Sequence, residues 1–297
     1  MDKRIDQLKQ EYQNLPIPEE LDTVVRKGIK DGKKGKKTFK VLTKVAAVAG
    51  ALAIFVGGIN ISPTMASALA EVPGMKKIVQ VLTFGKIEFD DGWHVADIET
   101  PVITGLEESG LGETLNQKYL EENQKLYEEF MAEVKAMEEF GESHFGVVSG
   151  YEVKTDNERL LAIGRYVLSV AGSSSTVYKY DTIDKVNEVL ITLPSLFKDD
   201  SYIEVIIKYL VEEMKARMEA DPNLVYWVER EDPEEELYFE PFTTIAPDQS
   251  FYINSDYKLV ISFDKYEIGP GYMGIQEFII PTEIIADHLV SNEYIKP

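Results

Sequence analysis

The stretch that most restricts how this chain can fold is 45–70, twenty-six residues without a charged side chain. Its most apolar part, 45–61, would form a helix about 25 Å long at about 1.5 Å per residue. That length is at the short end of what crosses the hydrocarbon core of a bilayer, and 62–70 can extend it into the interface. Because buried helices of soluble proteins seldom lack charge for so long, we predict one transmembrane helix over 45–63.

The charges on the two sides of this stretch differ in sign. Residues 26–44 hold nine basic side chains and one acidic one, and 1–44 as a whole carry a net charge of +5. Residues 45–297 carry 19 basic and 45 acidic side chains, net −26. Basic segments stay on the cytoplasmic side of a membrane span. We therefore expect a single-pass type II protein of the cell membrane, with a cytoplasmic head at 1–44 and an extracellular C-terminal domain at 71–297.

The acidic outer part limits the partners that it can bind. A surface of this charge repels nucleic acid and attracts cationic proteins, so we predict no nucleic-acid partner. The chain has no cysteine, which excludes disulfides and thiolate metal sites. Its three histidines, His94, His144 and His288, are far apart in sequence and do not have the spacing of a zinc site. We predict no metal, no cofactor, no catalytic residues and no enzymatic activity.

One glycine-rich stretch, Gly269–Gly274, matches the G-x-G-x-x-G pattern of dinucleotide-binding proteins. In those proteins the pattern opens a helix, whereas here 275–280 has the pattern of a strand, and Pro270 removes a backbone donor. We interpret the stretch as a turn that directs Tyr272 and Met273 outward. Such a turn is either an ordinary hairpin tip or an aromatic anchor for a partner.

The head contains the pattern of two short amphipathic helices. The second begins near Pro18 and has an apolar stripe formed by Leu21, Val24, Val25 and Ile29. Helices of this length are marginal in water, so they either pack on a partner or fray. We predict that the stripe of the second helix binds a partner protein.

The span ends in Ala66-Ser67-Ala68, small residues at alternate positions after an apolar helix. Signal peptidase accepts small side chains at these two positions, which predicts a cleavage segment at 64–70 with a cut between Ala68 and Leu69. A cut after Ala70 is the alternative register. Alanine-rich helix ends also occur by chance, so the pattern alone does not establish cleavage.

The outer domain has the pattern of an α+β fold, an antiparallel sheet with packed helices. Helices are expected at 73–83, at 111–140, from Ser201 to the residue before Pro222, and at 282–289. Ser201 and Glu204 have the spacing of a capping box, and 172–175 has the composition of a turn. Strands are expected at 86–89, 94–100, 147–153, 160–170, 176–182, 189–193, 251–254, 257–263 and 275–280.

Several long stretches resemble one known family. They are IPEELD (17–22), NISP (60–63), TLNQKYLEE (114–122), LFKDDSYIEVI (196–206), KLVISFDKYEIGPGYMG (258–274) and FIIPTEII (278–285). They are similar to the anti-sigma factor RsiV family of Gram-positive bacteria, and the resemblance covers nearly the whole chain. It implies that the head binds an extracytoplasmic-function sigma factor and that the outer domain is a receptor for lysozyme. It also implies cleavage by signal peptidase at the position of Ala68, followed by an intramembrane site-2 protease.

The resemblance and the charge lead to a hypothesis for the lysozyme contact. An acidic domain attracts basic lysozymes, but a loop that enters the lysozyme cleft has to provide specificity. We expect Gly269, Pro270, Gly271, Tyr272 and Met273 to form that loop, with Ser173 and Ser174 in the turn at 172–175 as the second choice. Two alternatives remain at this point: a membrane-anchored cell-wall enzyme and a polysaccharide-binding surface protein.

Overall fold

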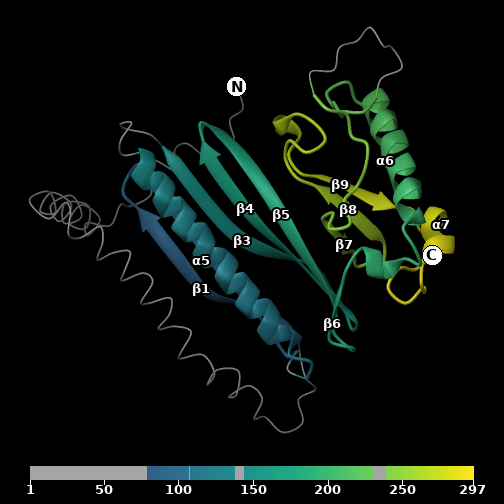
Figure 1. Ribbon diagram of the computed structural model, residues 1–297, viewed down its shortest axis with the longest axis horizontal. Helices are drawn as coiled ribbons and strands as arrows, with labels where there is room; N and C mark the ends of the chain where they lie inside the picture. The colour runs from purple at the N-terminus through teal and green to yellow at the C-terminus, as the bar shows by residue number, and fades with distance from the viewer. Residues whose placement is uncertain (1–78, 107, 138–143, 230–238) are drawn as a thin grey trace, which may run out of the picture. The chain divides into compact units, whose positions relative to one another are not determined.

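The computed structural model describes residues 79–106, 108–137, 144–229 and 239–297 (Figure 1). All of these residues belong to one compact unit. Within these four ranges no helix is long and apolar enough to cross a membrane. The predicted head, span and cleavage segment lie outside the described residues.

Six strands form the larger sheet, in the spatial order in which they occur along the chain. They are β1 (Gln80–Asp90), β2 (His94–Thr104), β3 (Phe145–Asp156), β4 (Leu160–Ala171), β5 (Ser173–Asp184) and β6 (Val189–Ile191). Neighbours are antiparallel except β2 and β3, which run parallel. A parallel pair needs a crossover connection, which the helix α5 (Leu111–Met137) supplies. The expectation of a purely antiparallel sheet is therefore wrong for this pair.

The helix α5 lies along one face of the larger sheet (Figure 1). Its buried side chains recur every three, four or seven residues and include Leu115, Tyr119 and Phe130. Leu115 and Tyr119 pack with Leu161, Ile163 and other residues of the sheet in one hydrophobic cluster. The structure thus confirms the helix that the apolar period predicted, from Leu111 to Met137.

A smaller antiparallel sheet and its helices form the second part of the core. The sheet contains β7 (Phe251–Ile253), β8 (Leu259–Phe263) and β9 (Gln276–Ile280). The helix α6 (Ser201–Ala220) buries Tyr202, Ile206, Leu210 and Met214 in the same hydrophobic cluster as the inner residues of these strands. The short helix α7 (Thr282–Ile285) follows β9 and continues into the 3-10 turn η3 (Ala286–His288). The remaining 3-10 turns are η1 (Pro194–Leu196) and η2 (Gly271–Met273).

The edge of β5 joins the two sheets. β6 pairs only with Thr182–Asp184 of β5, so most of that strand has no neighbouring strand on its outer side. The segment around β8 covers this edge with polar contacts. Tyr178 N donates to Asp264 Oδ1 at 2.7 Å, and Ser250 Oγ donates to Tyr178 O at 3.0 Å. An uncovered strand edge can pair with a strand of another chain. These contacts cover the edge of β5 and so prevent such pairing.

Three local predictions are wrong. The expected helix at 73–83 is a strand where it is described, since Gln80–Thr83 pairs with β2. The serines at 173–175 belong to β5, and Gly172 alone turns the chain. The expected capping box is also absent: Asp200 caps α6 without a side-chain hydrogen bond, and Ser201 Oγ is bonded to Asp199 and to His288 Nδ1.

Candidate functional site

The first part of the candidate site is the tip of the β4–β5 hairpin. Ala171 pairs directly with Ser173, so one residue makes the turn. That residue is Gly172, whose φ of +70° lies in the left-handed region that glycine adopts without strain. Ser173 is exposed at the tip and Ser174 is half-buried. The tip is therefore a tight one-residue turn between paired strands rather than a serine loop.

The second part is the connection between β8 and β9, which contains η2. Gly271 lies against the ring of Tyr266, and a Cβ built at position 271 would be 2.2 Å from two ring atoms. Only glycine permits this approach. Tyr266 itself has a φ of +72°, an uncommon value for a bulky residue that persists only when its surroundings hold it.

The two parts are in contact although about 93 residues of sequence separate them. The hydroxyls of Ser173 and Tyr266 lie 3.0 Å apart. Lys265 Nζ donates to Ser174 O at 2.6 Å and to Ser174 Oγ at 2.8 Å. We call the combined region, formed by Gly172–Ser174, Lys265–Tyr266 and Gly269–Met273, the tip surface. The two stretches that the sequence indicated separately are thus neighbours, and Lys265 and Tyr266, which sequence reasoning missed, connect them.

Tyr272 and Met273 have different environments on the tip surface. Tyr272 is 68 % exposed, and its hydroxyl donates to Asn223 O at 2.7 Å, which orients the ring. Met273 packs against the hydrophobic core, and its Sδ accepts a hydrogen bond from Val225 N at 3.4 Å. The expectation that both side chains point outward is therefore right for Tyr272 and wrong for Met273.

Acidic groups lie beside the tip surface. Glu267 is exposed, and its Oε2 accepts a hydrogen bond from Asp264 N. Burial raises the pKa of Asp264 above its usual value, although the hydrogen bond from Tyr178 N opposes this effect. The tip surface therefore combines an exposed, oriented aromatic ring with nearby carboxylates.

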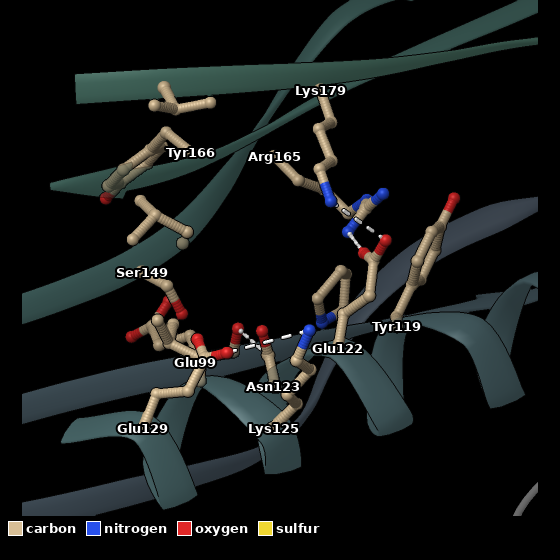
Figure 2. Close-up of a pocket in the computed structure, with 15 residues that line it drawn as sticks. Glu99, Tyr119, Glu122, Asn123, Lys125, Glu129, Ser149, Arg165, Tyr166 and Lys179 are labelled. Atoms are coloured by element: carbon tan, nitrogen blue, oxygen red, sulfur yellow. Dashed lines mark hydrogen bonds and ion pairs between the residues drawn. The ribbon is translucent and has the colours of Figure 1, made fainter. Parts of the chain in front are cut away.

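A separate pocket lies between α5 and the larger sheet, and Figure 2 shows the side chains that surround it. Arg165, 9 % exposed, bridges two carboxylates: its Nη1 contacts Glu122 and its Nη2 lies 3.2 Å from Asp181. Lys179 also contacts Glu122, at 3.1 Å. Burial would raise the pKa of Glu122, but Arg165 and Lys179 outweigh it and hold that pKa below the usual value. The one sequence signal for this network is a lone arginine within the apolar run 160–170.

The other predicted site residues lie outside the described part of the chain. These are Leu21, Val24, Val25 and Ile29 of the head, and Ala66, Ala68 and Leu69 of the cleavage segment. Their roles stay predictions. Among the described residues, no group of three or more histidine, aspartate or glutamate side chains is placed to hold a metal ion.

Comparison with known proteins relates the whole chain to one relative. This chain is 44% identical to the anti-sigma-V factor RsiV of Bacillus subtilis (strain 168) over 296 residues, which cover 100% of both chains. Residues 194–283 match the model of the protein family DUF3298, which is described as "Protein of unknown function". This match includes α6, the smaller sheet and the Gly269–Met273 part of the tip surface.

Two crystal structures share the fold. One is a member of the DUF3298 family from Bacteroides fragilis NCTC 9343, with a TM-score of 0.52 and 16% identity, covering 73% of this chain and 95% of that one. The other is a DUF3298 family protein from Pseudomonas aeruginosa PAO1, with a TM-score of 0.52 and 13% identity, covering 75% and 99%. At these identities the likeness establishes the fold alone.

Proposed function

This chain belongs to the family of the anti-sigma-V factor RsiV. We propose that it is an anti-sigma factor that releases its sigma factor when lysozyme binds to it. The observation that carries the proposal is 44% identity extending over the full length of both chains, head included. The partner of the head is an extracytoplasmic-function sigma factor, held through the stripe of Leu21, Val24, Val25 and Ile29. Such a helix lays its apolar face into a groove of its partner. The role is regulatory rather than catalytic.

The outer domain binds lysozyme through the tip surface. Residues 45–297 carry a net charge of −26, which accelerates the encounter with a basic protein by electrostatic steering. The exposed ring of Tyr272 then enters the cleft of lysozyme as an anchor. Its hydrogen bond to Asn223 O supports this role, because an oriented ring loses little conformational entropy on binding.

Release of the sigma factor requires two cuts. The chain lies in the cell membrane as a single-pass type II protein, and bound lysozyme exposes the cleavage segment 64–70 to signal peptidase. An intramembrane site-2 protease then cuts the span and frees the head with its sigma factor. Lysozyme has to bind the cleavable state more tightly than the resting state, since a ligand shifts an equilibrium only by its differential affinity.

A reporter strain tests the whole proposal. The full chain is expressed with a promoter that depends on its sigma factor. The added lysozyme is made inactive by replacing its catalytic glutamate with glutamine, which keeps the shape of its cleft. We expect reporter transcription to rise and a shed outer fragment to accumulate. Neither response should occur with another basic protein of similar size and charge. Transcription that stays repressed while lysozyme binds the cells would contradict the proposed release.

A further inference from the structure

The tip surface by itself is small for a specific contact between two proteins. It contains ten residues, whereas a standard interface buries about 800 Å² on each partner and uses about 20–30 residues a side. A lysozyme molecule bound at the tip surface therefore has to contact a neighbouring surface of the outer domain as well.

The segment 223–227 lies directly beside the tip surface. At one end of the segment, the Tyr272 hydroxyl donates to Asn223 O at 2.7 Å, and at the other end Trp227 N donates to Ile268 O at 2.9 Å. The four steps from Asn223 to Trp227 span at most about 14 Å. An interface of about 800 Å² on each partner is about 30 Å across, so Trp227 lies within reach of a protein that covers Tyr272.

Trp227 and Phe239 form a stacked aromatic pair on the outer side of this segment. The chain neighbours of Trp227, Tyr226 and Val228, are both 2 % exposed and belong to the hydrophobic core, whereas Trp227 between them is half-buried. Its ring stacks on Phe239 with ring centroids 4.4 Å apart and an interplanar angle of 12°. Neither ring is among the described residues that pack in the core cluster of the smaller sheet. We call Trp227 and Phe239 the aromatic pair.

The exposed aromatic side chains of the outer domain gather near this place. Four aromatic residues in the described part of the chain are exposed: Trp93, Phe239, Tyr266 and Tyr272. Tyr266 and Tyr272 belong to the tip surface, and Phe239, 55 % exposed, stacks on the segment beside it. Aromatic residues are enriched in protein interfaces. A ring that a stacking neighbour already orients also loses little conformational freedom when a partner covers it.

The charges beside the aromatic pair indicate what it binds. Glu229 and Glu240, close to Trp227 and Phe239 in sequence, are both exposed. The face of an aromatic ring attracts a cation, and the carboxylates attract it as well. This combination fits a positively charged side chain on a basic protein.

We propose that the aromatic pair is a second contact for lysozyme, in which the exposed ring of Phe239 receives a lysine or arginine side chain of lysozyme. This inference rests on the proposed lysozyme contact of the tip surface and extends that contact along the segment 223–227.

Three substitutions of Phe239 test the contact. Phe239→Ala should raise the Kd for lysozyme about five-fold or more, because the ring face is lost. Phe239→Leu should be weakened about as much, since leucine is apolar but has no ring face, whereas Phe239→Tyr should bind as the parent does. Surface plasmon resonance with the purified full-length chain measures these affinities. If Phe239→Leu binds as tightly as the parent, the ring receives no cation and the proposal is wrong.

A matched control separates the aromatic pair from exposed apolar surface in general. Val290 is 60 % exposed and follows η3, beyond the end of β9 that is farther along the chain from η2. Val290→Ala should bind lysozyme as the parent does. Thermal unfolding should be the same for the parent and all four variants, because both side chains are exposed. An equal loss of affinity in Val290→Ala and Phe239→Ala would overturn the proposal.

Trp227 provides a direct signal of the contact. The chain contains two tryptophans, Trp93 and Trp227, so the full-length chain labelled with 5-fluorotryptophan gives two fluorine resonances, which Trp93→Phe assigns. Unlabelled lysozyme should shift the Trp227 resonance and leave the Trp93 resonance in place. A Trp227 resonance that does not move at saturating lysozyme would contradict the second contact.

Tyr272→Ala distinguishes this inference from the proposed function. Weak lysozyme binding by Tyr272→Ala together with parent-like binding by Phe239→Ala would retain the tip surface as the contact and overturn the role of the aromatic pair. A parent chain that does not bind lysozyme would overturn both.

Discussion

Gly271 lies so close to the ring of Tyr266 that a Cβ at position 271 would be 2.2 Å from two of its ring atoms. Tyr266 has a left-handed backbone with a φ of +72°, and its hydroxyl lies 3.0 Å from Ser173 Oγ. A chain of three residues thus connects the two parts of the tip surface. Changes at any of them should alter the surface as a unit.

Replacement of Gly271 tests this coupling. Gly271→Ala should displace the Tyr266 ring and lower the free energy of unfolding by about 1–3 kcal/mol, the usual cost of an inserted methyl group. Thermal unfolding of the full-length chain measures the change. Gly146→Ala is the control, since a Cβ there meets only Val95 O at an ordinary 3.7 Å. Equal stability of the two variants would show that the ring moves aside without cost.

Removal of the exposed ring tests the lysozyme contact. Tyr272→Ala should weaken lysozyme binding by about 2 kcal/mol or more, about thirty-fold in Kd, because the anchor is lost. Tyr272→Ala should have the same association rate as the parent, since electrostatic steering depends on charge. In the parent and in all variants, the association rate should fall as the salt concentration is raised. Surface plasmon resonance separates the two rates. Trp93→Ala, which removes a 42 % exposed ring near the opposite edge of the larger sheet, is the control. Unchanged affinity in Tyr272→Ala would move the contact elsewhere.

The ion-pair network in the pocket predicts a pH dependence. The pKa of Glu122 is lowered from its ordinary value of 4.5, so its ionised form stabilises the folded state. This contribution is complete above pH 4.5 and is lost as the pH falls through the lower pKa of the folded protein. Glu122→Gln should therefore cost about 1–3 kcal/mol at neutral pH.

The comparison has to be made at more than one pH. Urea unfolding of Glu122→Gln and the parent should differ at pH 7 and converge once the pH falls below the lowered pKa of Glu122 in the folded protein. Glu121→Gln, on the exposed side of the same helix, should match the parent throughout. A difference between Glu122→Gln and the parent that persists unchanged at low pH would show that charge is not its cause.

The head should bind its sigma factor through the apolar stripe. Leu21→Asp or Val25→Asp should release the sigma factor without lysozyme, because a carboxylate buried in the groove has no partner. Reporter transcription and an immunoblot for the full chain measure the effect. Thr23→Asp, which places the same charge off the stripe, should remain repressed. Repression by the Leu21 variant at normal protein level would contradict the assignment.

Cleavage should depend on the small side chain of residue 68. Ala68→Trp should block the first cut, because an indole does not enter a pocket that accepts a methyl group, and lysozyme binding should persist. Ser67→Trp is the control, since the middle position does not enter a pocket. N-terminal sequencing of the shed fragment sets the register: Leu69 supports a cut after Ala68, and Glu71 supports the alternative. A start well inside the outer domain would contradict the mechanism.

Local sequence patterns predicted most of the elements. The apolar period of α5 and α6 and the β-branched runs of β3, β4 and β9 are visible without the structure. The residues that would anchor a ligand, Tyr272 and Ser173, were also indicated, because each accompanies a glycine that turns the chain. The prediction failed at Met273, whose side chain packs against core residues supplied by other elements.

The sequence by itself determined the elements whose hydrophobic pattern repeats within a few residues. It also determined the division of charge into a basic stretch at 1–44, an uncharged stretch at 45–70 and an acidic remainder. These properties follow from composition and from the period of a helix or strand. Only the tertiary structure decided that Gln80–Thr83 is a strand, that Ser201 contacts His288, and that Ser173 lies beside Tyr266. The partners in these three cases are 18 to 93 residues apart in sequence. No local pattern encodes such pairs, because they depend on how the strands and helices pack together.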